Sequence, residues 1–249
     1  MIINADDFGL SPSVNQGILE AYEMGSVSSA TMMVNLPGFQ GAVEMSRATP
    51  NLGVGLHFNL TYGSPISAPE EVPSLVNDRG EFSRKPDRWK KRDVWFELKK
   101  QWNQLLENHI TPTHLDSHQH IQIFPAVYES MVRLAREENV PMRKVGWEPT
   151  ITGVVHPKSS DRFILDVYFE DDGRTRLKQH LKSLQPGVTE LMCHPGHVDE
   201  YVYQISEWTE VREKELGVFC HYKVPYWINK YGIPLIHYGN LESVSDRPR

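Results

Sequence analysis

The stretch MIINADDFGLSPSVNQGILEAYEMGS, residues 1–26, holds the pattern that decides the fold. Its first residues form a short apolar run, which is typical of a buried strand. Ser11 can cap a helix, Pro12 suits the first helical turn, and Gly25 suits the point where the helix stops. The stretch therefore predicts one strand followed at once by one helix.

The same alternation of strand and helix continues along the chain. Strands are predicted over residues 28–36, 52–61, 111–118, 142–147, 162–169, 189–196 and 233–238, and helices over residues 38–48, 93–109, 125–139, 174–184 and 205–216. Strands separated by helices form parallel sheets. About seven such units predict an α/β fold, namely a single-domain distorted (β/α) barrel that spans residues 1–249.

Residues 62–88 interrupt this rhythm. The segment has few apolar residues and contains Pro65, Pro69, Pro73 and Pro86. Long irregular segments in compact domains are often lids or binding loops, although a plain surface insertion fits the pattern equally well. Both interpretations stay open, and a homodimer formed through this segment is compatible with either.

The composition argues against several classes of protein. The formal net charge is -6, and the basic residues are scattered apart from a cluster at residues 83–93, which we interpret as a solvated face rather than a nucleic-acid site. Cys193 and Cys220 are too few for a disulfide framework or a four-thiolate metal site. Met1 leads directly into a strand without a signal-peptide pattern, and no segment is apolar enough to span a bilayer. We therefore expect a cytoplasmic protein.

Acidic, amide and imidazole side chains collect where four of the predicted strands end. They are Asp6 and Asp7, His57 and Asn59, Asp116, His118 and His120, and His194 and His197. The functional loops of parallel α/β folds gather at this end of the strands. Taken singly, each residue fits a structural role in a turn or a helix cap. Four such groups at one rim predict a functional site.

The segment THLDSHQH, residues 113–120, is predicted to be extended. Four residues of extended chain span roughly 13 Å, so His114 and His118 cannot share one ion. Asp116, His118 and His120 would share one strand face at intervals of about 6.5 Å. We therefore predict His118 as the best-placed metal ligand of this segment.

These residue types indicate which chemistry the site can support. Two neutral imidazoles and one carboxylate, with positions left for water, suit Zn²⁺, Fe²⁺, Mn²⁺ or Co²⁺. A nucleophilic pair of Cys193 and His194 is disfavoured, because adjacent strand residues point to opposite faces. A metal site is therefore favoured over thiol chemistry.

Four motifs in a fixed order give a more specific indication. They are NADDFGLS near the start, GLHFNLT around His57, THLDSHQH around His118 and MCHPGH around His194. Together, over nearly the whole chain, they resemble the YdjC-like carbohydrate deacetylases of the polysaccharide-deacetylase superfamily, whose best-known members act on chitooligosaccharides. The resemblance implies a distorted barrel with a divalent metal at its rim.

The resemblance also implies a role for each motif residue. Asp7, His57 and His118 would hold one divalent cation, Asp6 would be the catalytic base, and His194 would be the general acid. The cation would be Mg²⁺ by resemblance, whereas the imidazole ligands suit Zn²⁺ or another transition metal equally well.

Two adjacent acids with different roles must both face the site. Neighbouring side chains of a regular strand point to opposite faces, so one of Asp6 and Asp7 would otherwise carry an uncompensated charge into the core. We expect the backbone to turn at Phe8 and Gly9, so that both carboxylates reach the site.

The implied substrate is a small N-acetylated sugar, with acetate and a free amine as products. A chitooligosaccharide or diacetylchitobiose fits this description, and a 6-phosphate is a reasonable variant of it. We expect His120, Asp116, His197 and Trp147 to bind this substrate, and we expect no nucleic-acid or membrane partner.

Two alternative functions remain open. One is a different metal-dependent hydrolase that acts on phosphoesters or on non-sugar amides, and the other is a non-catalytic sugar-binding protein of the same fold. Asp6 and His194 argue against the second alternative, because metal binding alone needs neither a base nor an acid.

Overall fold

Strand β1 (Ile2–Phe8) lies at the centre of the architecture. All seven of its residues are buried, and it pairs in parallel with β2 (Ser29–Met32) on one side and with β6 (Thr189–Cys193) on the other. Strands that are covered on both faces begin with a continuous apolar run, as β1 does.

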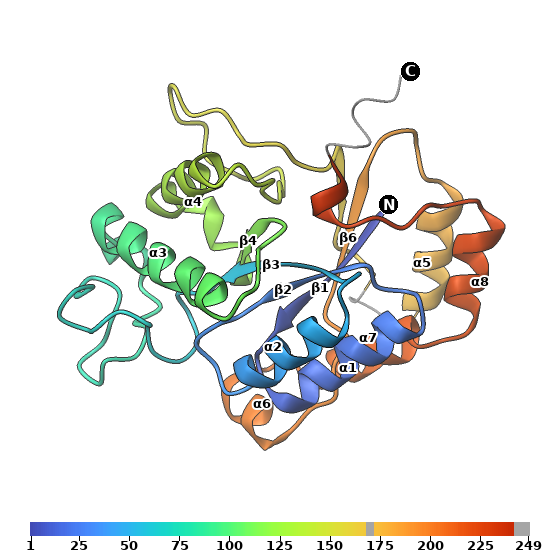
Figure 1. Cartoon of the computed structure of the whole chain (residues 1–249), viewed down its shortest axis with the longest axis horizontal. Helices are drawn as coiled ribbons and strands as arrows, with labels where there is room; N and C mark the ends of the chain where they lie inside the picture. The colour runs from blue at the N-terminus through green and yellow to red at the C-terminus, as the bar shows by residue number, and fades with distance from the viewer. Residues whose placement is uncertain (168–171, 242–249) are drawn as a thin grey trace.

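The computed structural model describes residues 1–167 and 172–241. The sheet also contains β3 (Gly53–Phe58), β4 (Leu115–Ser117) and β5 (Arg162–Ile164). Its six strands are all parallel, in the order β4-β3-β2-β1-β6-β5, and they curl into a half-barrel (Figure 1). The prediction of a single α/β domain with a distorted barrel is therefore confirmed.

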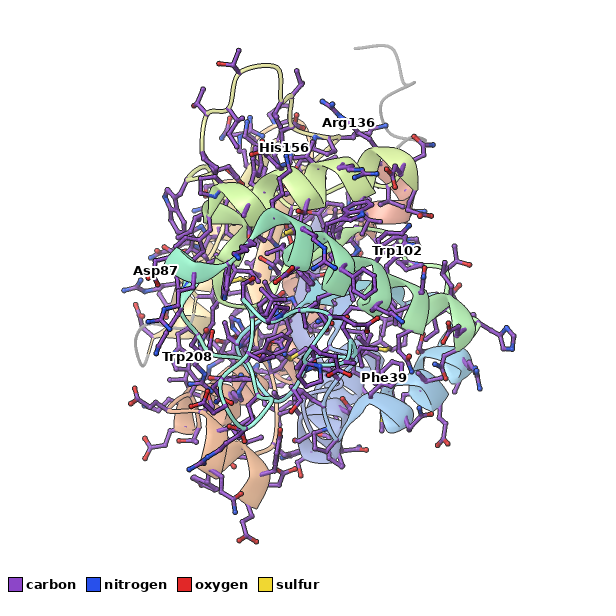
Figure 2. The ribbon with its side chains drawn as sticks, turned by 90° about the vertical axis from the view of Figure 1, so that its left-hand side faces the viewer. Phe39, Asp87, Trp102, Arg136, His156 and Trp208 are labelled. Atoms are coloured by element: carbon purple, nitrogen blue, oxygen red, sulfur yellow. The ribbon has the colours of Figure 1, made fainter. Side chains whose placement is uncertain are left out.

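Helices pack against this sheet and against one another. They are α1 (Pro12–Glu23), α2 (Phe39–Ala48), α3 (Lys91–Glu107), α4 (Pro125–Glu137), α5 (Gly173–Lys182), α6 (Glu200–Ile205), α7 (Glu210–Phe219) and α8 (Lys223–Lys230), with short 3-10 turns η1 (Pro86–Arg88), η2 (His118–Ile123) and η3 (Tyr238–Asn240). Figure 1 shows α1 beside α2 and α7, α3 beside α4, and α5 beside α8. Phe39 and Trp102, both labelled in Figure 2, are buried in the core. None of the described helices is long and apolar enough to cross a membrane.

An extra residue interrupts β1 where the two acids lie. The pairing of β1 with β2 shifts between Ala5 and Phe8, so that β1 has two residues opposite one residue of β2. Asp7 has a φ of 70°, in the left-handed region that residues other than glycine rarely adopt. The predicted turn at Phe8 and Gly9 is present, since the N–H of Leu10 donates to the carbonyl oxygen of Asp7 at 3.0 Å and Gly9 has a φ of 91°; the bulge lies just before it, at Asp7. A bulge of this kind re-aims side chains, and both carboxylates reach the same end of the sheet.

Two predicted strands are absent. Over residues 142–147, Met142 forms only a single bridge to Leu115 of β4, and Gly146 turns the chain with a φ of 91°. The pairing stops at Met142 because the backbone after it no longer runs alongside β4. The barrel is left open on this side.

The second absent strand is the one predicted over residues 233–238. Pro234 has no N–H to donate to a ladder, and its carbonyl accepts from the amino terminus of Met1 at 2.8 Å. Ile236 donates to the carbonyl oxygen of Met1 at 2.9 Å. The segment lies beside the start of β1 without forming a continuous ladder, so the sheet has six strands rather than about seven.

The predicted strand over residues 162–169 is shorter than expected. Strand β5 ends at Ile164, and residues 168–169 lie outside the described part of the chain.

The irregular segment at residues 62–88 is fastened to α3. The buried carboxylate of Glu97 accepts hydrogen bonds from the backbone N–H groups of Ile66 and Ser67, both at 2.9 Å. Asp93, one turn earlier on α3, accepts from the N–H of Ser74 at 3.0 Å. These bonds satisfy backbone donors that have no strand or helix partner, and they hold the segment next to the end of β3.

Candidate active site

The carboxyl ends of β1, β3, β4 and β6 supply residues to one cavity of about 260 Å³. Six of the residues singled out in the sequence line it, namely Asp6, Asp7, His57, His118, His120 and His194. Tyr62, Arg212 and Trp208, the last of which is labelled in Figure 2, also line it. The fold therefore gathers side chains from positions 6 to 212 around one space.

Asp6 is buried and held by a guanidinium group. Arg143 donates from Nη1 to Oδ2 at 2.6 Å and from Nη2 to Oδ1 at 2.7 Å, and Asn4 donates to Oδ1 at 2.8 Å. Burial alone would raise the pKa of Asp6, but the charge and hydrogen bonds of Arg143 hold this pKa well below its usual range. Asp6 is therefore an ionised carboxylate in a fixed orientation.

Arg143 binds two further buried carboxylates. Its Nη1 lies 2.7 Å from Oδ2 of Asp116, and its Nε donates to Oε1 of Glu190 at 2.8 Å. The hydroxyl of Tyr238 donates to the other oxygen of Glu190. Burial raises the pKa of Glu190 to about 7 despite the attraction of Arg143. The guanidinium of Arg143 thus lies among three buried carboxylates.

Three ligand atoms converge beside Asp6. Oδ1 of Asp7 lies 3.2 Å from Nε2 of His57 and 2.9 Å from Nδ1 of His118. One carboxylate oxygen and two imidazole nitrogens are the donors that first-row divalent ions accept. The three atoms lie within 4.8 Å of one another, so this donor set fits a single ion.

His57 has the support that metal-binding histidines usually have. Its Nδ1 lies 2.6 Å from Oδ1 of Asp116, which favours a proton on Nδ1 and leaves Nε2 to act as a donor atom. Burial opposes a charge on this ring, but Asp116 and the neighbouring carboxylates raise the pKa of His57 to about 10. A cation bound at Nε2 would replace the second proton. Asp116 itself lies behind His57 and does not line the cavity.

A second set of potential ligands, Asp6, His57 and Asp116, is also close together. The guanidinium of Arg143 already lies between its two carboxylates, with Nη1 2.6 Å from Asp6 and 2.7 Å from Asp116. Because this cation compensates the charge there, the set formed by Asp7 with the two histidines is the better metal site.

His194 is placed by α7. Its backbone N–H donates to Oε2 of Glu215 at 2.6 Å, and its ring Nδ1 lies 3.6 Å from Oε1 of the same carboxylate. The ring of Trp208 contacts His194 edge-on, with the ring centres 5.2 Å apart. His194 is thus a cavity histidine with a buried carboxylate behind it.

Of the remaining residues predicted for the site, His120 lines the cavity, whereas Trp147 and His197 do not. Strand β4 ends at Ser117, and Gln119 and His120 have φ values of 54° and 53°, so the prediction of one extended strand through His120 is wrong. The turn nevertheless brings His120 to the cavity wall. Burial is the main cause that lowers the pKa of His120 to about 3, and the charge of Arg143 adds to it, so the ring stays neutral.

Trp147 and His197 do not line the cavity. Trp147 is 57% exposed and touches the ring of His120, with the ring centres 5.9 Å apart. His197 is exposed, and its Nε2 lies 3.1 Å from both carboxylate oxygens of Glu20 on α1. Trp147 is therefore a neighbour of the site, whereas His197 faces α1.

Sequence reasoning missed Arg143, Arg212 and Glu215. Arg143 lies in a segment predicted as a strand, and its charge was the one feature of the sequence that could have marked it as a site residue. Arg212 and Glu215 are three residues apart on α7, which places them on one helix face. That face is buried, although the surrounding sequence EVREKEL reads as solvated.

The chain is similar in sequence to known proteins over most of its length. Residues 1–230 match the family model described as YdjC-like protein. The chain is 34% identical over 246 residues to a carbohydrate deacetylase of Thermoanaerobacter pseudethanolicus, covering 97% of this chain and 99% of that protein. It is 36% identical over 242 residues to a carbohydrate deacetylase of Geobacillus stearothermophilus, covering 95% and 96%.

Two solved structures share the fold. A protein of Enterococcus faecalis, for which cleavage of cellobiose phosphate has been suggested, has a TM-score of 0.84 and 29% identity, covering 98% of this chain and 97% of that one. A family 4 carbohydrate esterase of Streptomyces lividans in complex with acetate has a TM-score of 0.52 and 11% identity, covering 95% and 90%.

The metal site can be tested by direct binding. His57→Ala and His118→Ala each remove one of three ligands, and we expect Zn²⁺ affinity measured by calorimetry to fall by more than about 100-fold, since loss of even an outer partner costs roughly 10–100-fold. His197→Ala is the matched control and should bind Zn²⁺ as the unchanged protein does. Native affinity in the His57 and His118 variants would rule out this site.

Proposed function

The chain belongs to the YdjC-like protein family, and we propose that it is a metal-dependent carbohydrate deacetylase that hydrolyses the N-acetyl group of a sugar and releases acetate. The observation that carries this proposal is the contrast between two adjacent carboxylates. Arg143 binds both oxygens of Asp6, whereas Asp7 is bound by Arg212 only at Oδ2 and turns Oδ1 toward two imidazoles. One cavity therefore offers a base and a metal site side by side.

We assign the cation to Asp7, His57 and His118. Bound there, it would supply Lewis-acid stabilisation of the negative charge that develops when water attacks the acetyl group. Two nitrogen donors favour a transition ion such as Zn²⁺ over Mg²⁺, which prefers oxygen ligands.

Asp6 is suited to accept the proton of the attacking water. The fork of Arg143 keeps the carboxylate ionised and fixes its direction, so the base needs no reorganisation before the reaction. His194 is suited to deliver a proton to the departing amine. Glu215 holds its backbone and lies beside its ring. Proton acceptance and proton delivery are thus assigned to different strands, β1 and the end of β6.

Aromatic side chains support a sugar as the substrate. Tyr62 lines the cavity beside His118, with the ring centres 4.7 Å apart, and Trp147 offers an exposed ring next to His120. Aromatic faces of this kind suit the apolar faces of pyranose rings. Arg84 stacks over Tyr62 at 4.7 Å, so a 6-phosphate on a chitobiose-type sugar would meet a cation there.

The reaction class is tested by acetate release. We expect the protein to release acetate from N,N′-diacetylchitobiose or its 6-phosphate, to stop when a chelator removes the metal, and to recover when Zn²⁺ or Mg²⁺ is restored. Release of phosphate without acetate would support a phosphoester hydrolase instead. Sugar binding without acetate release under any metal would contradict the proposed function.

Arg143→Lys tests how Asp6 is kept ionised. Lysine retains the charge but loses the fork, so we expect kcat/KM to fall roughly 10²-fold through misplacement of the base. Because the hydrogen bonds of Arg143 contribute to lowering the pKa of Asp6, loss of the fork should raise that pKa and move the acidic limb of the pH profile to higher pH.

The control for this substitution is Arg133→Lys, on the exposed face of α4, where Arg133 pairs with Glu137. Its pH profile should match that of the unchanged enzyme. An acidic limb that stays in place in Arg143→Lys would show that the hydrogen bonds of the Arg143 fork do not set the pKa of Asp6.

A further inference from the structure

Arg212 lies on the cavity wall at the start of α7 and is almost completely buried. Its Nη2 donates to Oδ2 of Asp7 at 2.6 Å, and its Nε donates to the carbonyl oxygen of Trp208 at 3.0 Å. The side chain is 2% exposed. Two of the three nitrogens of the guanidinium are therefore fixed by the protein.

The third nitrogen has no such partner. Nη1 of Arg212 is buried and has no hydrogen-bond acceptor among the described residues. A buried donor without an acceptor is costly, and such groups at functional sites often await a ligand. Arg212 lines the cavity, so a ligand bound in the cavity lies beside its guanidinium.

The two oxygens of Asp7 have different partners, and these partners indicate where the acceptor for Nη1 lies. Its Oδ1 faces His57 and His118, while its Oδ2 is bound by Arg212. The guanidinium thus lies beside the proposed metal site. A second buried guanidinium, that of Arg143, does not line the cavity and is bound by three carboxylates.

We propose that Arg212 is a catalytic residue that donates a hydrogen bond from Nη1 to the oxygen of the acetyl group. This inference rests on the proposed deacetylase function. When the water oxygen bonds to the acetyl carbon, the π electrons of the carbonyl move onto its oxygen, and Arg212 stabilises that charge without losing a proton. The proton of the attacking water passes to Asp6. The electron pair on the acetyl oxygen then re-forms the carbonyl as the carbon–nitrogen bond breaks, the pair of the broken bond leaves with nitrogen, His194 protonates the amine, and the acetic acid formed ionises. Acetate is left beside the guanidinium.

A purely structural role makes a different prediction. If Arg212 only orients Asp7, its loss should weaken metal binding, and saturating metal should restore turnover. If Nη1 contacts the acyl oxygen, turnover should stay low at saturating metal, and the affinity for acetate should fall as well.

The experiment compares Arg212→Gln and Arg212→Lys with the unchanged enzyme at saturating Zn²⁺. We expect kcat to fall roughly 10²–10³-fold, the range for loss of one oxyanion donor, with one Zn²⁺ still bound. Calorimetry on the Zn²⁺-loaded protein should show acetate binding at least tenfold weaker. Arg133→Gln, which removes an exposed arginine on α4, should change neither quantity.

Native kcat at saturating Zn²⁺, or unchanged acetate affinity, would overturn the proposal. Arg212→Lys decides the matter if Arg212→Gln does not fold, because lysine keeps a charge beside Asp7 but cannot make all three contacts. Failure of the deacetylase function would appear separately, as absence of acetate release by the unchanged enzyme. The acetate-binding measurement would still report on Arg212 in that case.

Discussion

Neighbouring side chains of a strand point to opposite faces, and the extra residue in β1 removes that constraint at Asp6 and Asp7. The left-handed backbone of Asp7 turns both carboxylates toward one cavity. Several other elements of the site contact one of these two acids. Residues of β3 and of the turn after β4 meet Asp7, and the segment after α4 supplies the arginine that binds Asp6.

Charge compensation joins the two halves of the site. Nη1 of Arg143 contacts both Asp6 and Asp116, and Asp116 in turn binds Nδ1 of His57. The guanidinium of Arg143 therefore orients the proposed base Asp6 directly, and it orients the proposed metal ligand His57 through Asp116. Removing a partner from such a buried network leaves uncompensated charge, so its members depend strongly on one another.

Much of the fold was predictable because helix and strand periodicities are local. The strand ends at Asp6, His57 and His194 follow from that pattern, and parallel strands bring their carboxyl ends together. The turn at Phe8 and Gly9 was predicted, but the bulge at Asp7 was not, because register depends on pairing with β2. Arg143 has partners on three strands far away in sequence, which no local pattern reveals. The strand predicted at 233–238 failed because its hydrogen bonds are to Met1.

The central claim is that adjacent acids have different roles, and isosteric substitution of each acid tests it most directly. Bound metal and kcat should be measured together for Asp6→Asn and Asp7→Asn. The account predicts that Asp6→Asn retains the metal while kcat falls roughly 10²–10⁴-fold, as for loss of a general base, and that Asp7→Asn loses the metal. Loss of metal in Asp6→Asn, with metal retained in Asp7→Asn, would contradict it.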